Sequence, residues 1–131
     1  MRILLIPSFC LCFSAVSAQQ PWHAPSEAQK QKSPINLKDE KVISKGEKLF
    51  GSTCWTCHGE QGEGDGMLAE SLDPKPANLT NSTIQQQTDG AFYWKISKGR
   101  GTMVGYEDAL SDEQRWQLVA FIRSLAKRNE P

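Results

Sequence analysis

The chain has 131 residues, which is enough for one domain with a single hydrophobic core and too few for two. Its 15 Lys and Arg residues balance its 15 Asp and Glu residues, so its formal net charge is zero. Because the composition gives no sign of a basic face, we expect no nucleic acid among its partners.

Residues 1–18 have the layout of a secretory signal peptide. Arg2 precedes an apolar run that ends at Val16, and small residues follow up to Ala18. The run is too short to cross a bilayer as a permanent anchor, which needs about 20 residues. We therefore expect cleavage after Ala18, an exported or periplasmic protein, and no membrane span once the leader is gone. An uncleaved N-terminal anchor is the alternative.

Residues 19–38 predict a flexible N-terminal tail, because prolines are scattered among Gln, Lys and Ser, and few side chains can be buried. Trp22 and His23 are the conspicuous residues of this segment. His23 is a candidate iron ligand and Trp22 a candidate docking anchor, but a loosely held surface tail is the favoured interpretation.

A helix is expected from Asp39, a plausible N-cap, to Phe50. Its apolar residues recur three and four positions apart, which is the pattern of an amphipathic helix. Gly46 lies on the apolar side and costs about 1 kcal/mol of helix stability relative to Ala. A second helix that crosses closely at Gly46 would explain this glycine.

Cys54, Cys57 and the adjacent His58 have the spacing of a haem c attachment motif. On a short helix the two thiols fall on one side, where they can form thioethers with the two vinyl groups of a haem. His58 can then bind the iron through its imidazole. A zinc site and a thioredoxin-like dithiol are the alternatives, but the first lacks ligands and the second lacks strands.

Residues 59–66 form a glycine-rich, acidic segment that lacks the pattern of a phosphate or calcium loop, so a tight surface turn is expected. Residues 67–72 predict a short helix that stops before Pro74. Residues 74–76 are expected to be extended and to direct a carbonyl oxygen at the Nδ1–H of His58, which would fix the imidazole.

Thr88 is a plausible N-cap for a helix that ends at Lys98, before Gly99. Met103 lies in the loop that follows, outside any apolar helical face. Given a haem, Met103 is the favoured second axial ligand, ahead of Met67 and His23.

Ser111 and Gln114 predict a capping box at the start of the last helix. Apolar residues at 118, 121, 122 and 125 keep helical spacing. Phe121 is the expected partner of Gly46 where the first and last helices cross.

Taken together, residues 39–128 resemble a class I cytochrome c of bacteria. The resemblance includes the helix with Gly46, the segment from Cys54 to Gly66, the Lys75–Leu79 segment, Met103 and the last helix. It implies an all-α cytochrome c fold, with three to five helices around one haem in a domain of residues 39–131.

The resemblance also implies the roles of the site residues. Cys54 and Cys57 would bind haem c covalently, and His58 and Met103 would be the axial ligands of its iron. The family commonly has a proline directly after the axial methionine, whereas this chain has Val104, which leaves the loop less stiff.

The expected function is the transfer of single electrons between redox proteins such as a dehydrogenase and a terminal oxidase. Methionine and histidine ligation raises the reduction potential and leaves no iron position open for a substrate. Two alternatives stay open. One is an electron-accepting subunit of a dehydrogenase or oxidase complex, and the other is a haem peroxidase or sensor with an open iron site.

Overall fold

The computed structural model describes residues 21–128, so the predicted signal peptide and the first two residues of the predicted tail lie outside it. Within this range the chain is all-α, as expected. It contains six α-helices and one 3-10 helix, and five of the α-helices lie beyond residue 39, where the sequence indicated three to five. The helices are α1 (Ser26–Lys30), α2 (Glu40–Thr53), α3 (Trp55–His58), η1 (Ala69–Ser71), α4 (Ser82–Gln85), α5 (Asp89–Lys98) and α6 (Asp112–Arg128).

The three long helices begin where their capping residues predicted. The Asp39 carboxylate accepts a hydrogen bond from the Lys41 amide at 2.8 Å, and Thr88 caps α5 in the same way. At α6, the Gln114 amide donates to Ser111 Oγ at 3.2 Å. The Ser111 amide donates in return to Gln114 Oε1 at 2.9 Å, which confirms the capping box. These bonds satisfy backbone donors that a helix N-terminus otherwise leaves unpaired.

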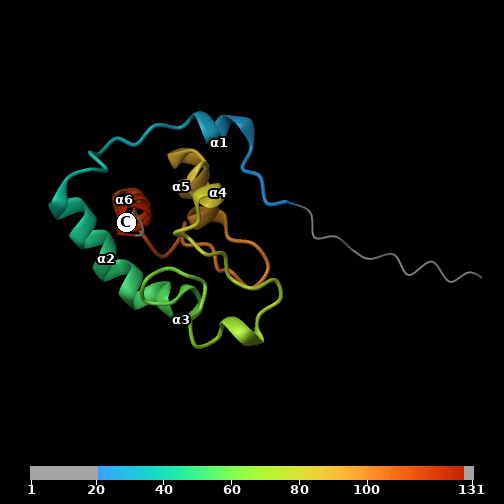
Figure 1. Cartoon of the computed structure of the whole chain (residues 1–131). Helices are drawn as coiled ribbons and strands as arrows, with labels where there is room; N and C mark the ends of the chain where they lie inside the picture. Colours follow the sequence, from blue (N-terminus) through green and yellow to red (C-terminus); the bar gives the residue numbers. More distant parts are fainter. Residues whose placement is uncertain (1–20, 129–131) are drawn as a thin grey trace, which may run out of the picture.

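Helices α2 and α6 form the most extensive helix pair (Figure 1). They cross at Gly46, which is buried against Gln117 and Phe121 of α6. Beside this crossing, the rings of Phe50 and Phe121 lie with their centroids 5.0 Å apart. Both side chains are almost completely buried. The predicted crossing of the first and last domain helices at Gly46 is therefore confirmed. It brings the end of α2, and with it Cys54, against the core.

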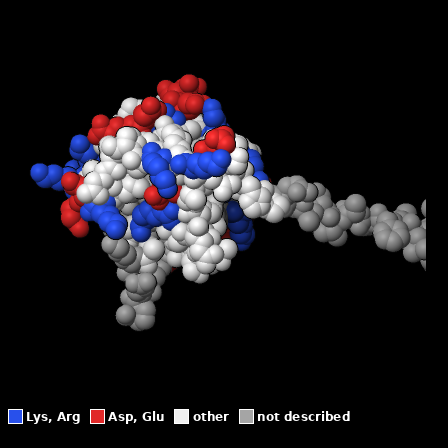
Figure 2. Space-filling model, turned by 90° about the horizontal axis from the view of Figure 1, so that it is seen from above, with Lys and Arg blue, Asp and Glu red and all other residues white. Residues whose placement is uncertain are grey.

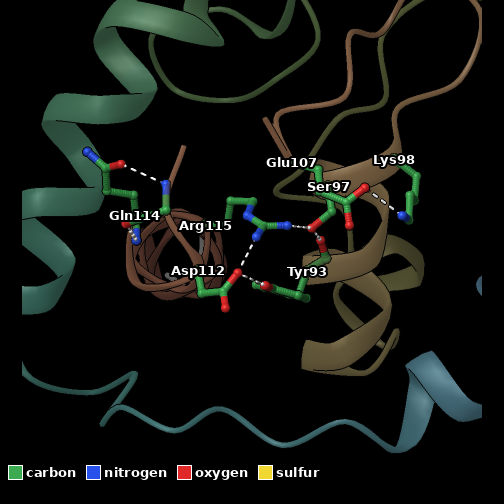
Figure 3. Close-up of polar contacts among 8 residues, drawn as sticks. Tyr93, Ser97, Lys98, Glu107, Asp112, Gln114 and Arg115 are labelled. Carbon is green, nitrogen blue, oxygen red and sulfur yellow. Dashed lines mark hydrogen bonds and ion pairs between the residues drawn. The ribbon is translucent and has the colours of Figure 1, made fainter. Parts of the chain in front are cut away.

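Helix α5 joins α6 through an aromatic stack and a buried guanidinium. The rings of Tyr93 and Trp116 stack at 4.3 Å, and the Arg115 side chain extends from α6 toward α5 between Asp112 and Ser97 (Figure 3). Tyr93 Oη donates to Asp112 Oδ1 at 2.9 Å. Because Arg115 is buried, its charge depends for compensation on the Asp112 carboxylate and on the Ser97 hydroxyl, which both accept hydrogen bonds from it.

The segment expected to be a flexible tail follows the surface of the domain from Pro21 onward. It contains helix α1, which lies beside α5 (Figure 1). Ala24 is buried, and Ile35 and Leu37 are partly buried against the hydrophobic core. The composition of this segment did not predict these contacts. A few apolar side chains are enough to hold a short segment against the surface of a folded domain.

The surface carries both signs of charge, and Figure 2 shows Lys and Arg side chains interspersed with Asp and Glu. In the part of the chain that the structure describes, no helix has the length and apolar character needed to span a membrane.

Candidate haem site

A cavity of about 570 Å³ lies between the helices and two loops, one that contains residues 74–79 and one that contains Met103. Its inner wall comes from the core, including Phe50, Leu118 and Ile122. Its rim comes from the 74–79 segment, the Met103 loop and the N-terminal segment that begins at Pro21. Such a mainly apolar cavity with a few polar groups suits a flat hydrophobic cofactor.

Cys54, Cys57 and His58 lie on a single helical turn at the edge of this cavity. The Cys57 amide donates to the Cys54 carbonyl at 3.2 Å, and the His58 amide donates to the same carbonyl at 3.0 Å. Cys54 and His58 line the cavity, and both thiols are free and partly exposed. Cys57 lies on the same turn but does not itself line the cavity. The turn thus carries the two thiols and the imidazole that covalent haem attachment needs.

The Cys54 thiol is held in its protonated form. Burial is the largest effect that raises its pKa, a hydrogen bond to Thr53 opposes this, and nearby Cys57 raises the pKa further. A thiol of this kind is a weak nucleophile at neutral pH, which does not favour the alternative of a thioredoxin-like dithiol. In the described part of the chain, no group of three or more His, Cys, Asp or Glu residues could hold a metal ion.

His58 is oriented by a backbone carbonyl. Its Nδ1 lies 3.2 Å from the carbonyl oxygen of Ala77, directly after the Pro74–Pro76 segment. Because a carbonyl oxygen can only accept, Nδ1 carries the proton when this bond forms, and Nε2 is left with a lone pair for a metal. Burial lowers the pKa of His58, while the bond to Ala77 raises it, so the imidazole is neutral at pH 7.

The glycine-rich segment holds the Ala77 carbonyl in place. The Leu79 amide donates to the Gly62 carbonyl at 2.7 Å, which ties the two loops together. At Gly64, where φ is +80°, an added Cβ would lie 2.6 Å from the Pro76 carbonyl oxygen. The glycines therefore permit a close approach of backbone to backbone, and the expected turn is part of the support for His58.

Met103 lines the same cavity from a loop that is fastened to the end of α5. The amides of Tyr106 and Glu107 donate to the carbonyls of Ile96 and Ser97 at 2.9 and 3.1 Å. Lys98 and Glu107 form an ion pair at 2.5 Å across the base of the loop (Figure 3). Closer to the tip, Arg100 and Met103 exchange two backbone hydrogen bonds.

This loop is also joined to the helix that precedes Cys54. Tyr106 Oη donates to the Thr53 carbonyl at 2.9 Å, although the two residues are 53 positions apart. Val104, which stands where related proteins commonly have proline, is 65% exposed and does not contribute to the core. Hydrogen bonds at the base of the loop therefore supply restraint that a proline would otherwise add.

The two alternative ligands are placed differently. His23 lines the cavity, whereas Met67 is 74% exposed and does not line it. Trp22, Lys95 and Arg100 also line the cavity, and neither Lys95 nor Arg100 was considered as a site residue from the sequence. In the sequence these two residues are only a lysine in the last turn of an aromatic-rich helix and an arginine just after it. Such a pair does not indicate a binding site unless the cavity is known.

Known proteins were compared by sequence and by structure. The family model for cytochrome c matches residues 43–126. No curated protein sequence matches the chain. Among solved structures, a chain of the reducing HAO-like protein complex of Kuenenia stuttgartiensis is similar, with a TM-score of 0.61 and 25% identity. Cytochrome CL of the marine methylotrophic bacterium Methylophaga aminisulfidivorans is also similar, with a TM-score of 0.54 and 24% identity.

These likenesses are partial in extent. The first covers 76% of this chain and 52% of the other, and the second covers 70% and 64%. This chain thus spans about half of the first protein's length and less than two thirds of the second's. The family match, in contrast, covers more than half of this chain and includes the cavity's core and both of its long loops. On this match, and on the donor set at the cavity, the chain belongs to the cytochrome c family as a class I member that binds haem c covalently.

Proposed function

We propose that this protein carries single electrons between redox proteins in the periplasm or an equivalent exported space. The supporting observation is that His58 and Met103, from distant parts of the chain, line one cavity that Cys54 also borders. When bound, haem c supplies an iron that alternates between Fe(II) and Fe(III). Cys54 and Cys57 would hold it by thioethers, and His58 and Met103 would bind its iron.

The chain's own residues favour electron transfer over substrate chemistry. His58 is fixed by Ala77 with Nε2 available, and Met103 is fixed by the loop that Tyr106 and Glu107 fasten to α5. Two restrained ligands leave no open position for a substrate. The apolar wall excludes water, which favours the less charged Fe(II) state and, together with a thioether ligand, raises the potential.

The test replaces Met103 and compares ligand binding and potential. The wild type should bind cyanide slowly and should not turn over peroxide. Met103→Ala should have a lower potential, should lose the sulfur-to-iron absorption band and should bind cyanide quickly. Met67→Ala is the matched control, because Met67 is exposed and does not line the cavity. If the wild type binds cyanide quickly and turns over peroxide, the protein is an open haem enzyme or sensor and the proposal is wrong.

A second candidate function has support from the likeness to a chain of a multi-protein complex. In this alternative the protein accepts electrons as a permanent subunit of a larger assembly. Purification of the native protein under mild conditions separates the two. A carrier elutes alone, whereas a permanent subunit elutes with its partner at constant stoichiometry.

A further inference from the structure

The N-terminal segment forms a wall of the cavity and is held there by helix α5. At Gly90, in the first turn of α5, an added Cβ would lie 2.1 Å from the Ala28 carbonyl oxygen and 2.8 Å from that of Gln31. The backbone of α1 and its C-terminal end therefore lie directly against α5. Gln29 Nε2 donates to the Ala24 carbonyl at 2.7 Å, which closes the turn that precedes α1.

This arrangement places Trp22 in the lining of the cavity. Its ring meets the ring of Trp94 edge to face, with centroids 6.4 Å apart. Two cations lie beside the same indole, with Lys95 Nζ at 5.2 Å and Arg100 Cζ at 4.9 Å from its centroid. Trp22, Lys95 and Arg100 all line the cavity. We call these three residues the Trp22 cluster.

The charged side chains that line the cavity are all positive. Among the described residues, Lys75, Lys95 and Arg100 line the cavity, and no Asp or Glu does. Lys75 is paired with Glu70 at 2.7 Å. Lys95 donates to the neutral amide oxygen of Gln87, and burial, followed by the repulsion of Arg100, lowers its pKa. Both cations line the cavity, so a group with negative charge bound there would be attracted by both.

The family's cofactor brings that charge. Haem c carries two propionate side chains, and these carboxylates lie on the half of the porphyrin away from the two thioether positions. A carboxylate taken out of water needs a cation or several hydrogen-bond donors. We propose that Lys95 and Arg100 bind the two haem carboxylates and that Trp22 positions both cations. Residues 21–31 are then a wall of the haem site.

The roles of the three residues differ. Arg100 offers a planar guanidinium that can bind a carboxylate through two hydrogen bonds, whereas Lys95 offers a single ammonium group. The Trp22 ring lies near both cations and attracts each by a cation–π interaction, so it would act through the cations. The proposal rests on haem attachment alone and is independent of whether the protein carries electrons.

The experiment compares five variants of the haem-loaded full-length protein: Lys95→Gln, Arg100→Gln, Trp22→Ala, Trp22→Phe and Lys45→Gln. Lys45 is an exposed lysine of α2 that does not line the cavity, so its variant controls for the loss of one charge. The first readout is the resonance Raman bending bands of the propionates, which respond to hydrogen bonding of their carboxylates. The second is the midpoint potential.

Lys95→Gln and Arg100→Gln should each shift the propionate bands, and Lys45→Gln should not. Both should lower the potential more than Lys45→Gln does, because removal of a nearby positive charge favours Fe(III). Trp22→Ala should shift the same bands, and Trp22→Phe, which keeps an aromatic ring, should shift them less. Unchanged propionate bands in both Lys95→Gln and Arg100→Gln would overturn the proposal.

The role of Trp22 is tested separately. If the two cation variants shift the bands while Trp22→Ala leaves them unchanged, the assignment of Trp22 as a positioning residue is wrong. If Trp22→Ala fails to accumulate with haem, the comparison of Trp22→Phe with wild type decides the point. The proposal then requires a smaller band shift in Trp22→Phe than in either cation variant. Because Raman bands are read on the isolated protein, failure of the carrier function does not affect this test.

Discussion

Gly46 of helix α2 and Gln117 of helix α6 meet backbone to backbone. A Cβ added to Gly46 would lie 1.9 Å from the Gln117 carbonyl oxygen and 3.0 Å from the Cβ of Phe121. The first distance is far inside van der Waals contact, so the glycine allows the closest approach of the two helices that enclose the site. Phe121 was expected to fill this notch, and it is a neighbour of it, but the nearest group is main chain.

We predict that Gly46→Ala destabilises the haem-loaded protein by about 1–3 kcal/mol or more, because backbone must move to admit the methyl group. The matched control is Gly51→Ala in the same helix. A Cβ at Gly51 would meet nothing within 4 Å, so this variant should instead stabilise by about 0.5–1 kcal/mol through helix propensity. Urea unfolding followed by circular dichroism measures both. Equal effects of the two substitutions would contradict the tight crossing.

Covalent attachment should depend on Cys57 of α3 and on Cys54, the N-cap residue of that helix. Cys54→Ala combined with Cys57→Ala removes both thioethers, so the polypeptide should show no haem staining on a denaturing gel. Each single variant should keep one bond and retain staining at a lower yield. Staining retained in the double variant would show that Cys54 and Cys57 do not attach the haem.

The bond between Met103 and iron should depend on Tyr106. Tyr106→Phe removes the hydrogen bond to the Thr53 carbonyl, which is worth about 0.5–1.5 kcal/mol, and so loosens the Met103 loop. The sulfur-to-iron absorption band of the oxidised protein should then fade at a lower temperature than in wild type.

Val104→Pro should act in the opposite direction. A proline restricts the conformations of the unligated loop, and this should stabilise the ligated loop by about 0.4–1 kcal/mol. Its band should persist to a higher temperature than that of wild type. The two variants thus bracket wild type, and a Tyr106→Phe band as heat-resistant as the wild-type band would show that the loop does not need this bond.

Protein without haem should be largely unfolded. Without the cofactor the mainly apolar wall of the cavity would face water, and a small domain has only about 5–15 kcal/mol of stability to offset the lost burial. Expression without residues 1–18 should yield this form if haem is attached only after export. Circular dichroism should show little helix, and a cooperative melt with native helicity would disprove the prediction.

Alkaline stability should depend on Tyr93. Burial, and then the hydrogen bond to Asp112, raise the pKa of Tyr93 above its ordinary value of about 10. The folded state thus keeps this proton at a pH where the unfolded state has lost it. The contribution of this proton to the free energy of unfolding is complete below the pKa that Tyr93 has in the unfolded state. It is lost as pH rises through the higher pKa of the folded state.

Tyr93→Phe should therefore lose less stability than wild type between neutral pH and pH values above about 10. Urea unfolding at the two ends of this range measures the difference. Parallel losses in both proteins would show that Tyr93 is not the group responsible.

The sequence by itself determined the cofactor and the beginnings of the long helices. The spacing of Cys54, Cys57 and His58 predicts haem attachment, because this chemistry needs its groups on one helical turn. Asp39, Thr88 and Ser111 mark helix starts because a capping side chain bonds to backbone two or three residues away. Asn81 caps α4 in the same local way, so that helix was within reach of the sequence but was not predicted.

Only the tertiary structure decided which distant groups support the site. The bond from Tyr106 to Thr53 joins residues that no periodicity relates. For His58, the sequence indicated a carbonyl acceptor from residues 74–76, and the structure places it one residue further, at Ala77. The placement of Trp22 beside Lys95 and Arg100 turned an expected tail into part of the cavity wall. A local pattern records bonds within one turn, whereas these contacts follow from how α1, α5 and the Met103 loop pack around a shared cavity.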